Sequence, residues 1–222
     1  KSLILLLLVG TVSYGQLVNN GGTITIESAA TLRVEANLSN NSGSTITNNG
    51  TIEVQNNLTN AGTITSGSSS KIAFIGSVNS DVTSGGATFR YVEMKKTAQN
   101  ITLLDEMKIS NTLDFVNASN HVKIGNNNLR LLAGASITNA GSNKYVETNG
   151  TGLLIKELTA NASKTFEVGD ATYYSPVSCA VVGTTYANAS VGARSYTTGL
   201  TAKYSETTDY ISREWQITAT GI

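Results

Sequence analysis

Four consecutive segments of the sequence decide the fold: TLRVEANLSN (31–40), TIEVQNNLTN (51–60), KIAFIGSVNS (71–80) and YVEMKKTAQN (91–100). They follow one another at a spacing of twenty residues, and in each of them apolar residues alternate with polar ones. This alternation is the period of a β-strand that buries one face. Three apolar columns are therefore expected to stack from segment to segment: Leu32, Ile52, Ile72 and Val92; Val34, Val54, Phe74 and Met94; and Leu38, Leu58, Val78 and Ala98.

A second repeat overlaps the first: LVNNGGTIT (17–25), LSNNSGSTIT (38–47) and LTNAGTIT (58–65). Each copy places an Asn/Gly turn before a Thr-Ile-Thr strand. The sequence therefore predicts an all-β fold, a parallel β-solenoid (β-helix) of roughly seven rungs, stacked about 4.8 Å apart into a rod on the order of 30 Å long. We expect the turn asparagines to form side-chain amide ladders. The inward residues are expected to include Ile24, Ile46, Ile52 and Ile64, and the outward ones Arg33, Glu35 and Glu53.

The composition excludes several classes of function. Fifteen basic residues balance fifteen acidic ones, so the chain lacks the positive surface expected of a protein that binds nucleic acid or an anionic membrane. Only 14% of the residues are charged, whereas 21 are glycine and one is proline, which favours β-structure with many turns. A single cysteine, Cys179, permits no internal disulfide, and a single histidine, His121, excludes a His-rich metal site.

The first residues, KSLILLLLVGTVSYGQ (1–16), have the pattern of a secretory signal peptide. Lys1 precedes a short apolar run, and small residues follow at Ser13 and Gly15. The run is too short to span a bilayer, which needs about 20 apolar residues. We therefore predict a signal peptide over 1–15, a secreted or cell-surface location, no membrane span and a β-solenoid repeat domain over 16–160.

The character of the sequence changes near residue 160. No aromatic residue occurs between 17 and 70, whereas ten of the fourteen aromatics lie beyond residue 100. Alternating strands rich in aromatics are typical of sandwich domains. The segment 161–222 is therefore predicted to be β-rich and partially β-sandwich-like, and to be an incomplete domain that continues into further C-terminal domains.

Several stretches carry a resemblance to a protein family: YGQ (14–16), the NNGTI rung (48–52), NGTGLLIKEL (149–158), KTFEVGDATYYSPV (164–177) and SREWQI (212–217). In these the chain resembles the large secreted repeat proteins of Bacteroidota, many of which end in a type IX secretion sorting domain. The resemblance implies an adhesin-like protein, secreted or displayed on the surface of a Gram-negative bacterium.

No stretch of the sequence has a catalytic signature. Polysaccharide-cleaving β-helices need clustered carboxylates or a basic residue on one face, whereas Glu27, Glu35 and Glu53 are isolated. Asp105 and Glu106 are adjacent, so they face opposite sides of a strand. We predict no catalytic, metal or cofactor-binding residue and no enzyme activity.

Two sets of residues are candidates for binding. Three Thr-x-Thr pairs put two hydroxyls each on one face of a strand, and stacked pairs of this kind bind ice: Thr23, Thr25, Thr45, Thr47, Thr63 and Thr65. Their spacings of 22 and 18 residues are unequal. The second set could stack on sugar rings, since aromatic faces combine apolar area with polar edges: Tyr173, Tyr174 and Trp215.

These observations favour a non-enzymatic, adhesin-like structural module of a larger secreted protein. Its expected partners are a cell surface, the extracellular matrix or a polysaccharide. The alternatives are a carbohydrate-binding module, an ice-binding solenoid and, least favoured, a polysaccharide-active β-helix enzyme.

Overall fold

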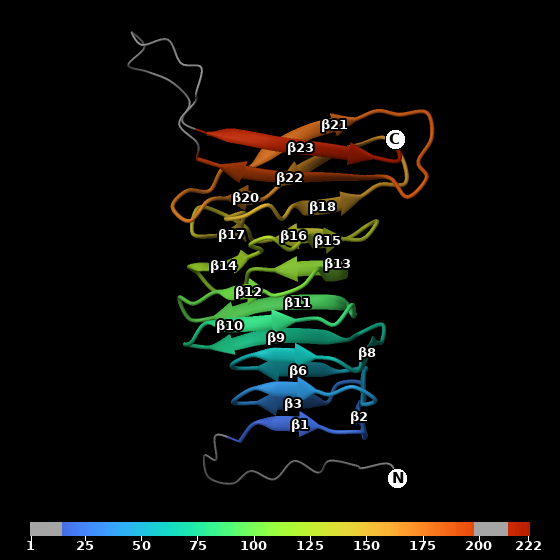
Figure 1. Cartoon of the computed structure of the whole chain (residues 1–222), viewed down its shortest axis with the longest axis vertical. Coiled ribbons are helices and arrows are strands. Elements are labelled where there is room, and N and C mark those ends of the chain that lie inside the picture. The colour runs from blue at the N-terminus through green and yellow to red at the C-terminus, as the bar shows by residue number, and fades with distance from the viewer. Residues whose placement is uncertain (1–14, 198–212) are drawn as a thin grey trace.

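The computed structural model describes residues 15–197 and 213–222, so the predicted signal peptide lies almost entirely outside the described residues. The described part of the chain contains strands and turns and no helix. The strands stack along the long axis of the molecule, from β1 at one end to β21, β22 and β23 at the other (Figure 1). This is the predicted β-solenoid.

Three sheets form the sides of the stack. The eight-stranded sheet joins its strands by seven parallel pairings and contains β1 (Leu17–Asn19), β4 (Leu38–Asn40), β7 (Leu58–Asn60), β10 (Ser80–Thr83), β12 (Ile101–Leu103), β14 (Asn120–Lys123), β17 (Lys144–Glu147) and β20 (Val168–Gly169). The three-stranded sheet contains β2 (Thr23–Ile26), β5 (Thr45–Asn48) and β8 (Thr63–Ser66). The ten-stranded sheet contains β3 (Thr31–Val34), β6 (Thr51–Val54), β9 (Lys71–Gly76), β11 (Thr88–Lys96), β13 (Met107–Asp114), β15 (Leu129–Leu131), β16 (Ser136–Thr138), β18 (Leu154–Glu157), β22 (Ser190–Tyr196) and β23 (Glu214–Thr220).

Two of the three predicted apolar columns are confirmed. The structure pairs Leu32 with Ile52, Ile52 with Ile72 and Ile72 with Val92. The column that starts at Val34 continues through Val54, Phe74 and Met94 in the same way. These side chains point into one continuous core, which stabilises neighbouring rungs together because one rung cannot bury its apolar face alone.

The third predicted column is wrong above Leu58. Leu58 pairs with Val82 rather than with Val78, and Val82 pairs in turn with Leu103 rather than aligning with Ala98. The cause is the length of β9, which continues for six residues to Gly76 at a φ of 83° and so delays the start of the next strand. Val78 is consequently 45% exposed.

The predicted inward residues have the expected orientation. Ile46 and Ile52 are fully buried and Ile64 is 6% exposed, whereas Ile24 is only partly buried because β2 is an end strand of its sheet. On the outer surface, the Arg33 guanidinium lies 3.1 Å from carboxylate oxygens of both Glu35 and Glu53.

The predicted amide ladder is present along the first three rungs. The Nδ2 of Asn19 donates to the Oδ1 of Asn40 at 2.9 Å, and Asn40 donates to Asn60 in the same way at 2.8 Å. Asn60 then donates to the backbone carbonyl of Ser84 at 2.8 Å, where the series ends. All three asparagines are buried, so the ladder satisfies polar groups inside the stack and holds the turn of each rung above the last.

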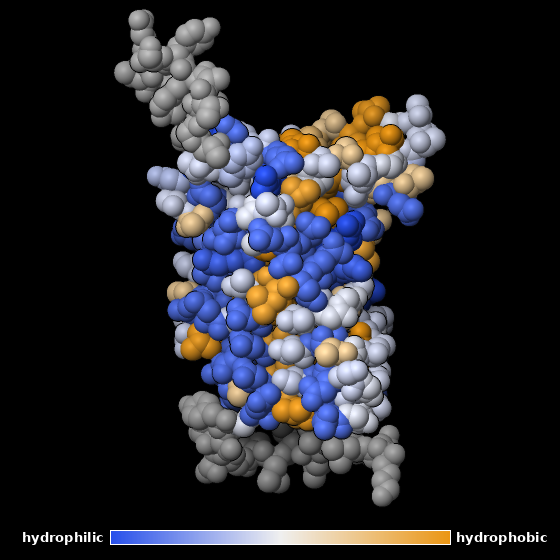
Figure 2. Space-filling view, in the orientation of Figure 1, coloured by the Kyte–Doolittle hydropathy of each residue, from blue (hydrophilic) through white to orange (hydrophobic). Residues whose placement is uncertain are grey.

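Pairing changes from parallel to antiparallel in the C-terminal segment. β22 pairs antiparallel with β18 and with β23, and so extends the ten-stranded sheet. β19 (Ala162–Phe166) and β21 (Val177–Val181) form a separate antiparallel pair, in which Cys179 is half-buried. Strongly apolar surface gathers at this end of the molecule (Figure 2), where Val182, Ile217 and Ile222 are exposed.

Candidate functional site

The Thr-x-Thr pairs lie side by side on the three-stranded sheet. Thr23, Thr45 and Thr63 are direct partners in neighbouring strands, and so are Thr25, Thr47 and Thr65. The intervening isoleucines point into the core, so the six threonines face outward in two columns. Strand geometry separates the hydroxyls by about 4.8 Å between rungs and by about 6.6 Å within a strand. We call this surface the threonine face.

The turns before β2, β5 and β8 differ in length, and this difference compensates for the unequal sequence spacing of the threonine pairs. Four residues separate Asn40 from Thr45, whereas two separate Asn60 from Thr63. The longer turn is closed by a hydrogen bond from the Ser44 amide to the Asn41 carbonyl and contains Gly43 at a φ of 78°. The asparagine ladder fixes the position from which each turn starts, so the threonines align even though their sequence spacing varies.

The three aromatic residues predicted to stack on sugars have different neighbours. Tyr173 is 59% exposed, and the guanidinium carbon of Arg213 lies 4.4 Å from its ring centroid. Tyr174 is half-buried, with its ring centroid 5.5 Å from that of Tyr145. Trp215 is 37% exposed and donates from its indole nitrogen to the Ser175 carbonyl at 2.8 Å. Each ring is thus held by a different neighbour.

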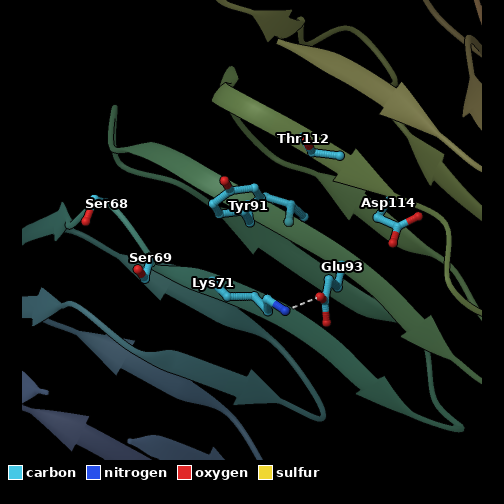
Figure 3. Close-up of a pocket in the computed structure, with 8 residues that line it drawn as sticks. Ser68, Ser69, Lys71, Tyr91, Glu93, Thr112 and Asp114 are labelled. Atoms are coloured by element: carbon cyan, nitrogen blue, oxygen red, sulfur yellow. Dashed lines mark ion pairs between the residues drawn. The ribbon is translucent and has the colours of Figure 1, made fainter. Parts of the chain in front are cut away.

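A groove of about 430 Å³ lies on the outer surface beside the loop that follows β8 (Figure 3). We call it the corner groove. It is lined by Ser68 and Ser69 of the loop, Lys71 of β9, Tyr91 and Glu93 of β11, and Thr112 and Asp114 of β13.

The corner groove arises where the solenoid changes how it turns between two sheets. In the first three rungs a turn separates the three-stranded sheet from the ten-stranded sheet, and residues 67–70 form the last of these turns. β11 instead runs through the corner as one strand of nine residues. Opposite Arg90, β13 contains one extra residue, because Phe89 pairs with Ile109 whereas Tyr91 pairs with Thr112. Such bulges redirect side chains, and here both Arg90 and Tyr91 point outward.

The register of the sheet brings the groove residues together. Tyr91 lies directly between Lys71 and Thr112, and Glu93 lies beside Asp114. Figure 3 shows Lys71 pointing along the sheet to Glu93, with 2.5 Å between its Nζ and Oε1. Lys95 approaches the other oxygen of Glu93 at 2.6 Å. The Oδ1 of Asp114 accepts hydrogen bonds from Thr138 and Asn139.

Glu93 carries a negative charge at neutral pH. Burial alone would raise its pKa, but hydrogen bonds from Lys71 and Lys95 and the charges of both amines outweigh burial, so the pKa lies below its ordinary value. A general acid in glycoside hydrolysis needs a raised pKa. Glu93 is therefore suited to accept hydrogen bonds rather than to donate a proton.

The carboxylates considered in the sequence do not assemble into an acid–base pair. Arg33 bridges Glu35 and Glu53, so the two carboxylates share one positive charge. Asp105 accepts hydrogen bonds from the amides of Ser84 and Gly85, whereas Glu106 faces Arg130. Within residues 15–197 and 213–222 no group of three His, Cys, Asp or Glu residues is placed to hold a metal ion.

His121 lies in a partly buried polar cluster. Its Nδ1 is 3.0 Å from Oε2 of Glu147, and its ring centroid is 4.1 Å from that of Tyr145. Glu147 is 2% exposed and also contacts Lys123 at 3.3 Å. Burial would raise the pKa of Glu147, but the hydrogen bond to His121 and the charge of Lys123 lower it further than burial raises it.

Sequence reasoning missed the corner groove. YVEMKK (91–96) had been aligned with three earlier segments, and that alignment already places Tyr91 on the outer side beside Lys71. The available signal was an aromatic residue at an outward position, where the earlier copies have Thr31 and Thr51. The neighbouring Asp114 could not be found in this way, because the extra residue in β13 breaks the twenty-residue spacing.

Within residues 15–197 and 213–222, the structure contains no helix that is long and apolar enough to cross a membrane. In comparisons with protein-family models, with curated proteins and with solved structures, nothing matches this chain.

Proposed function

We propose that this protein is a secreted or cell-surface structural module, non-enzymatic and adhesin-like, that belongs to a larger polypeptide of a Gram-negative bacterium. The observation that supports the proposal best is the unbroken core. Buried apolar side chains run from Ile26 in the first rung to Ala193 near the opposite end. A stack with one continuous core is stiff along its axis, and its seven parallel steps of about 4.8 Å span roughly 34 Å.

Two further observations fit a module that links a surface to other domains. The sequence of residues 1–16 has the features of an export signal. At the other end, β23 pairs with β22 and with no other strand of residues 15–197, and its residues Trp215 and Ile217 are exposed. Exposed apolar residues on an edge strand are typical of surfaces that another segment covers.

Two measurements test this proposal on the full chain. Small-angle scattering of the purified protein is expected to give an elongated particle. The chain is expressed with its predicted signal peptide, residues 1–15, in a Bacteroidota host. We expect the protein to reach the cell surface, where protease added to intact cells degrades it. Retention in the cytoplasm would contradict secretion, and a spherical scattering profile would contradict the rod.

Ice binding is a second candidate, and the threonine face is the observation that favours it. Its hydroxyls form a regular two-dimensional array on parallel strands, despite unequal spacing in the sequence. Thermal hysteresis of the purified protein is the test. Activity that Thr47→Tyr abolishes and Thr59→Tyr, on the exposed face of β7, leaves intact would support this function. Absence of any ice shaping would contradict it.

Carbohydrate binding by the C-terminal aromatic residues remains a prediction. It requires glycan binding that is lost in Tyr174→Ala or Trp215→Ala. A polysaccharide-active enzyme would instead release products from a polysaccharide, and we expect no turnover.

A further inference from the structure

We propose that the corner groove binds a neutral oligosaccharide, with Tyr91 as the stacking platform and Asp114 as a hydrogen-bond acceptor for sugar hydroxyls. This site is separate from Tyr173, Tyr174 and Trp215. It supplies a ligand class for the proposed adhesin-like role and uses only the solenoid surface.

The first argument is the shape of the groove and the position of the aromatic ring. The volume of about 430 Å³ is within the range of small-ligand sites. Tyr91 is half-exposed on the outer surface, and the Arg90 guanidinium carbon lies 5.5 Å from its ring centroid. This cation–π contact restrains the ring. A restrained, half-exposed ring offers apolar area to the C–H face of a pyranose at little entropic cost.

The second argument is the balance of charge. Lys71 and Lys95 both contact Glu93, and with Arg90 beside the Tyr91 ring and Asp114 on β13 the groove and its edge contain three cationic groups and two carboxylates. The lowered pKa of Glu93 keeps its carboxylate paired with both amines at neutral pH. A surface whose charges are largely paired, with a net charge of only +1, gives little electrostatic advantage to a charged ligand. A neutral saccharide is therefore the ligand class that fits.

The third argument is the set of polar groups around the ring. Oδ1 of Asp114 is held by Thr138 and Asn139, whereas Oδ2 has no hydrogen-bond partner among the described residues. The hydroxyls of Ser68 and Ser69 also line the groove and can both donate and accept, whereas the Thr112 hydroxyl donates to Oδ1 of Asn111 at 2.8 Å and can accept. The Asp114 carboxylate is a fixed acceptor, and the serine hydroxyls beside it can rotate. Together they can bind the hydroxyl groups of a sugar ring, which both donate and accept hydrogen bonds.

The test is isothermal titration of the full chain with cellohexaose, mannohexaose and xylohexaose, after a glycan array has identified the preferred backbone. We expect Tyr91→Ala and Asp114→Asn each to weaken binding by about ten-fold or more. Tyr91→Phe keeps the ring and is expected to retain most of the affinity. Leu104→Ala is the control, because Leu104 is an exposed apolar residue outside the groove and outside the C-terminal aromatic residues.

Circular dichroism and the unfolding midpoint of each variant separate loss of the site from loss of the fold. Glycan binding that survives in folded Tyr91→Ala would overturn the proposal, and so would binding that disappears in Leu104→Ala. Absence of binding to every neutral glycan at millimolar concentration would also overturn it. In that last case an elongated scattering profile would still support the proposed rod, so the two failures are distinguishable.

Discussion

The lower rungs, β1 to β9, and the upper rungs, β10 to β20, stack in the same parallel way but turn their corners differently. Each lower rung consists of three short strands separated by turns, and the buried polar groups of these rungs are uncharged asparagine and serine side chains such as Asn40, Asn60 and Ser44. In the upper rungs β11 and β13 continue through a corner as long strands. Buried polar groups there include the charged side chains of Lys96, Glu147 and Lys156.

The two regions also fill their cores differently. Isoleucine, leucine and valine fill the lower rungs up to β8, whereas Phe89, Phe115 and Tyr145 are among the largest buried side chains of the upper ones. The comparison shows that the repeat specifies how one rung stacks on the next. A rung with a different corner still stacks on its neighbours when its buried side chains have a different volume.

The largest effect is expected from Ile52→Asp, which places a carboxylate at a fully buried position of the lower core. An unpaired buried charge is strongly unfavourable, and neighbouring rungs depend on this position, so we expect a loss of about 4 kcal/mol or more in the free energy of unfolding. Hydrogen exchange is expected to show lost protection over the lower rungs and retained protection above β12. Thr59→Asp, on the exposed face of β7, is the control. Unchanged cooperative unfolding of Ile52→Asp would contradict the stacked core.

Asn40→Ala tests whether amides hold the lower corners. Asn40 accepts from Asn19 and donates to Asn60 and to the Thr63 carbonyl, so its removal leaves several buried groups unpaired. We expect a loss of about 3 kcal/mol, measured by denaturant unfolding. Asn20→Ala, which removes an exposed acceptor, is expected to change stability by less than about 0.5 kcal/mol. Equal effects of the two substitutions would show that the ladder does not stabilise the turns.

Lys96 gives the upper rungs a pH dependence that the asparagine ladder lacks. Its buried amine donates to the carbonyls of Gln55 and Ile75, and burial lowers its pKa from 10.5 to about 8. Between pH 8 and 10.5 the unfolded chain therefore binds more protons than the folded one, and stability rises with pH. Lys96→Met is expected to remove this rise. Unfolding curves of both proteins across this range check it, and parallel pH profiles would contradict it.

The smallest effect is expected from Glu53→Gln on the outer surface of the lower rungs. The pair with Arg33 is 3.1 Å long, but the Arg33 side chain is 52% exposed, so water and salt screen the interaction. We expect a loss of less than about 0.5 kcal/mol that vanishes at high salt. A loss of about 3 kcal/mol would show that outer charges contribute to stacking as much as turn amides do.

The lower rungs could be predicted from the sequence in considerable detail. Alternation and a constant spacing were sufficient to find the columns of Leu32 and Val34, the inward isoleucines and the amide ladder. The prediction from the twenty-residue spacing failed where a strand contains more residues than the corresponding strands of its neighbours. β9 is longer than its predecessors, which displaced Val78, and β13 contains an extra residue, which concealed the proximity of Glu93 and Asp114.

For the threonine face, the sequence underestimated the regularity of the structure. The unequal sequence spacing of the threonines argues against a regular array only if sequence distance is equated with spatial distance. Turns of different length between fixed asparagines remove the difference. The contacts around Tyr173 and Trp215 depend on packing between segments far apart in the chain, as in the bond from Trp215 to Ser175, and no local pattern reports such contacts.

The direction of the asparagine ladder has a consequence for how such a chain can lengthen. Asn40, in the middle of the series, accepts one amide hydrogen bond from Asn19 in the rung before it and donates one to Asn60 in the rung after it. A duplicated twenty-residue unit inserted beside this rung would meet an acceptor and a donor in the right places, so gene duplication can add length there without leaving a buried amide unpaired. The series stops at the Ser84 carbonyl, which only accepts. The ladder thus permits growth by simple duplication below Ser84.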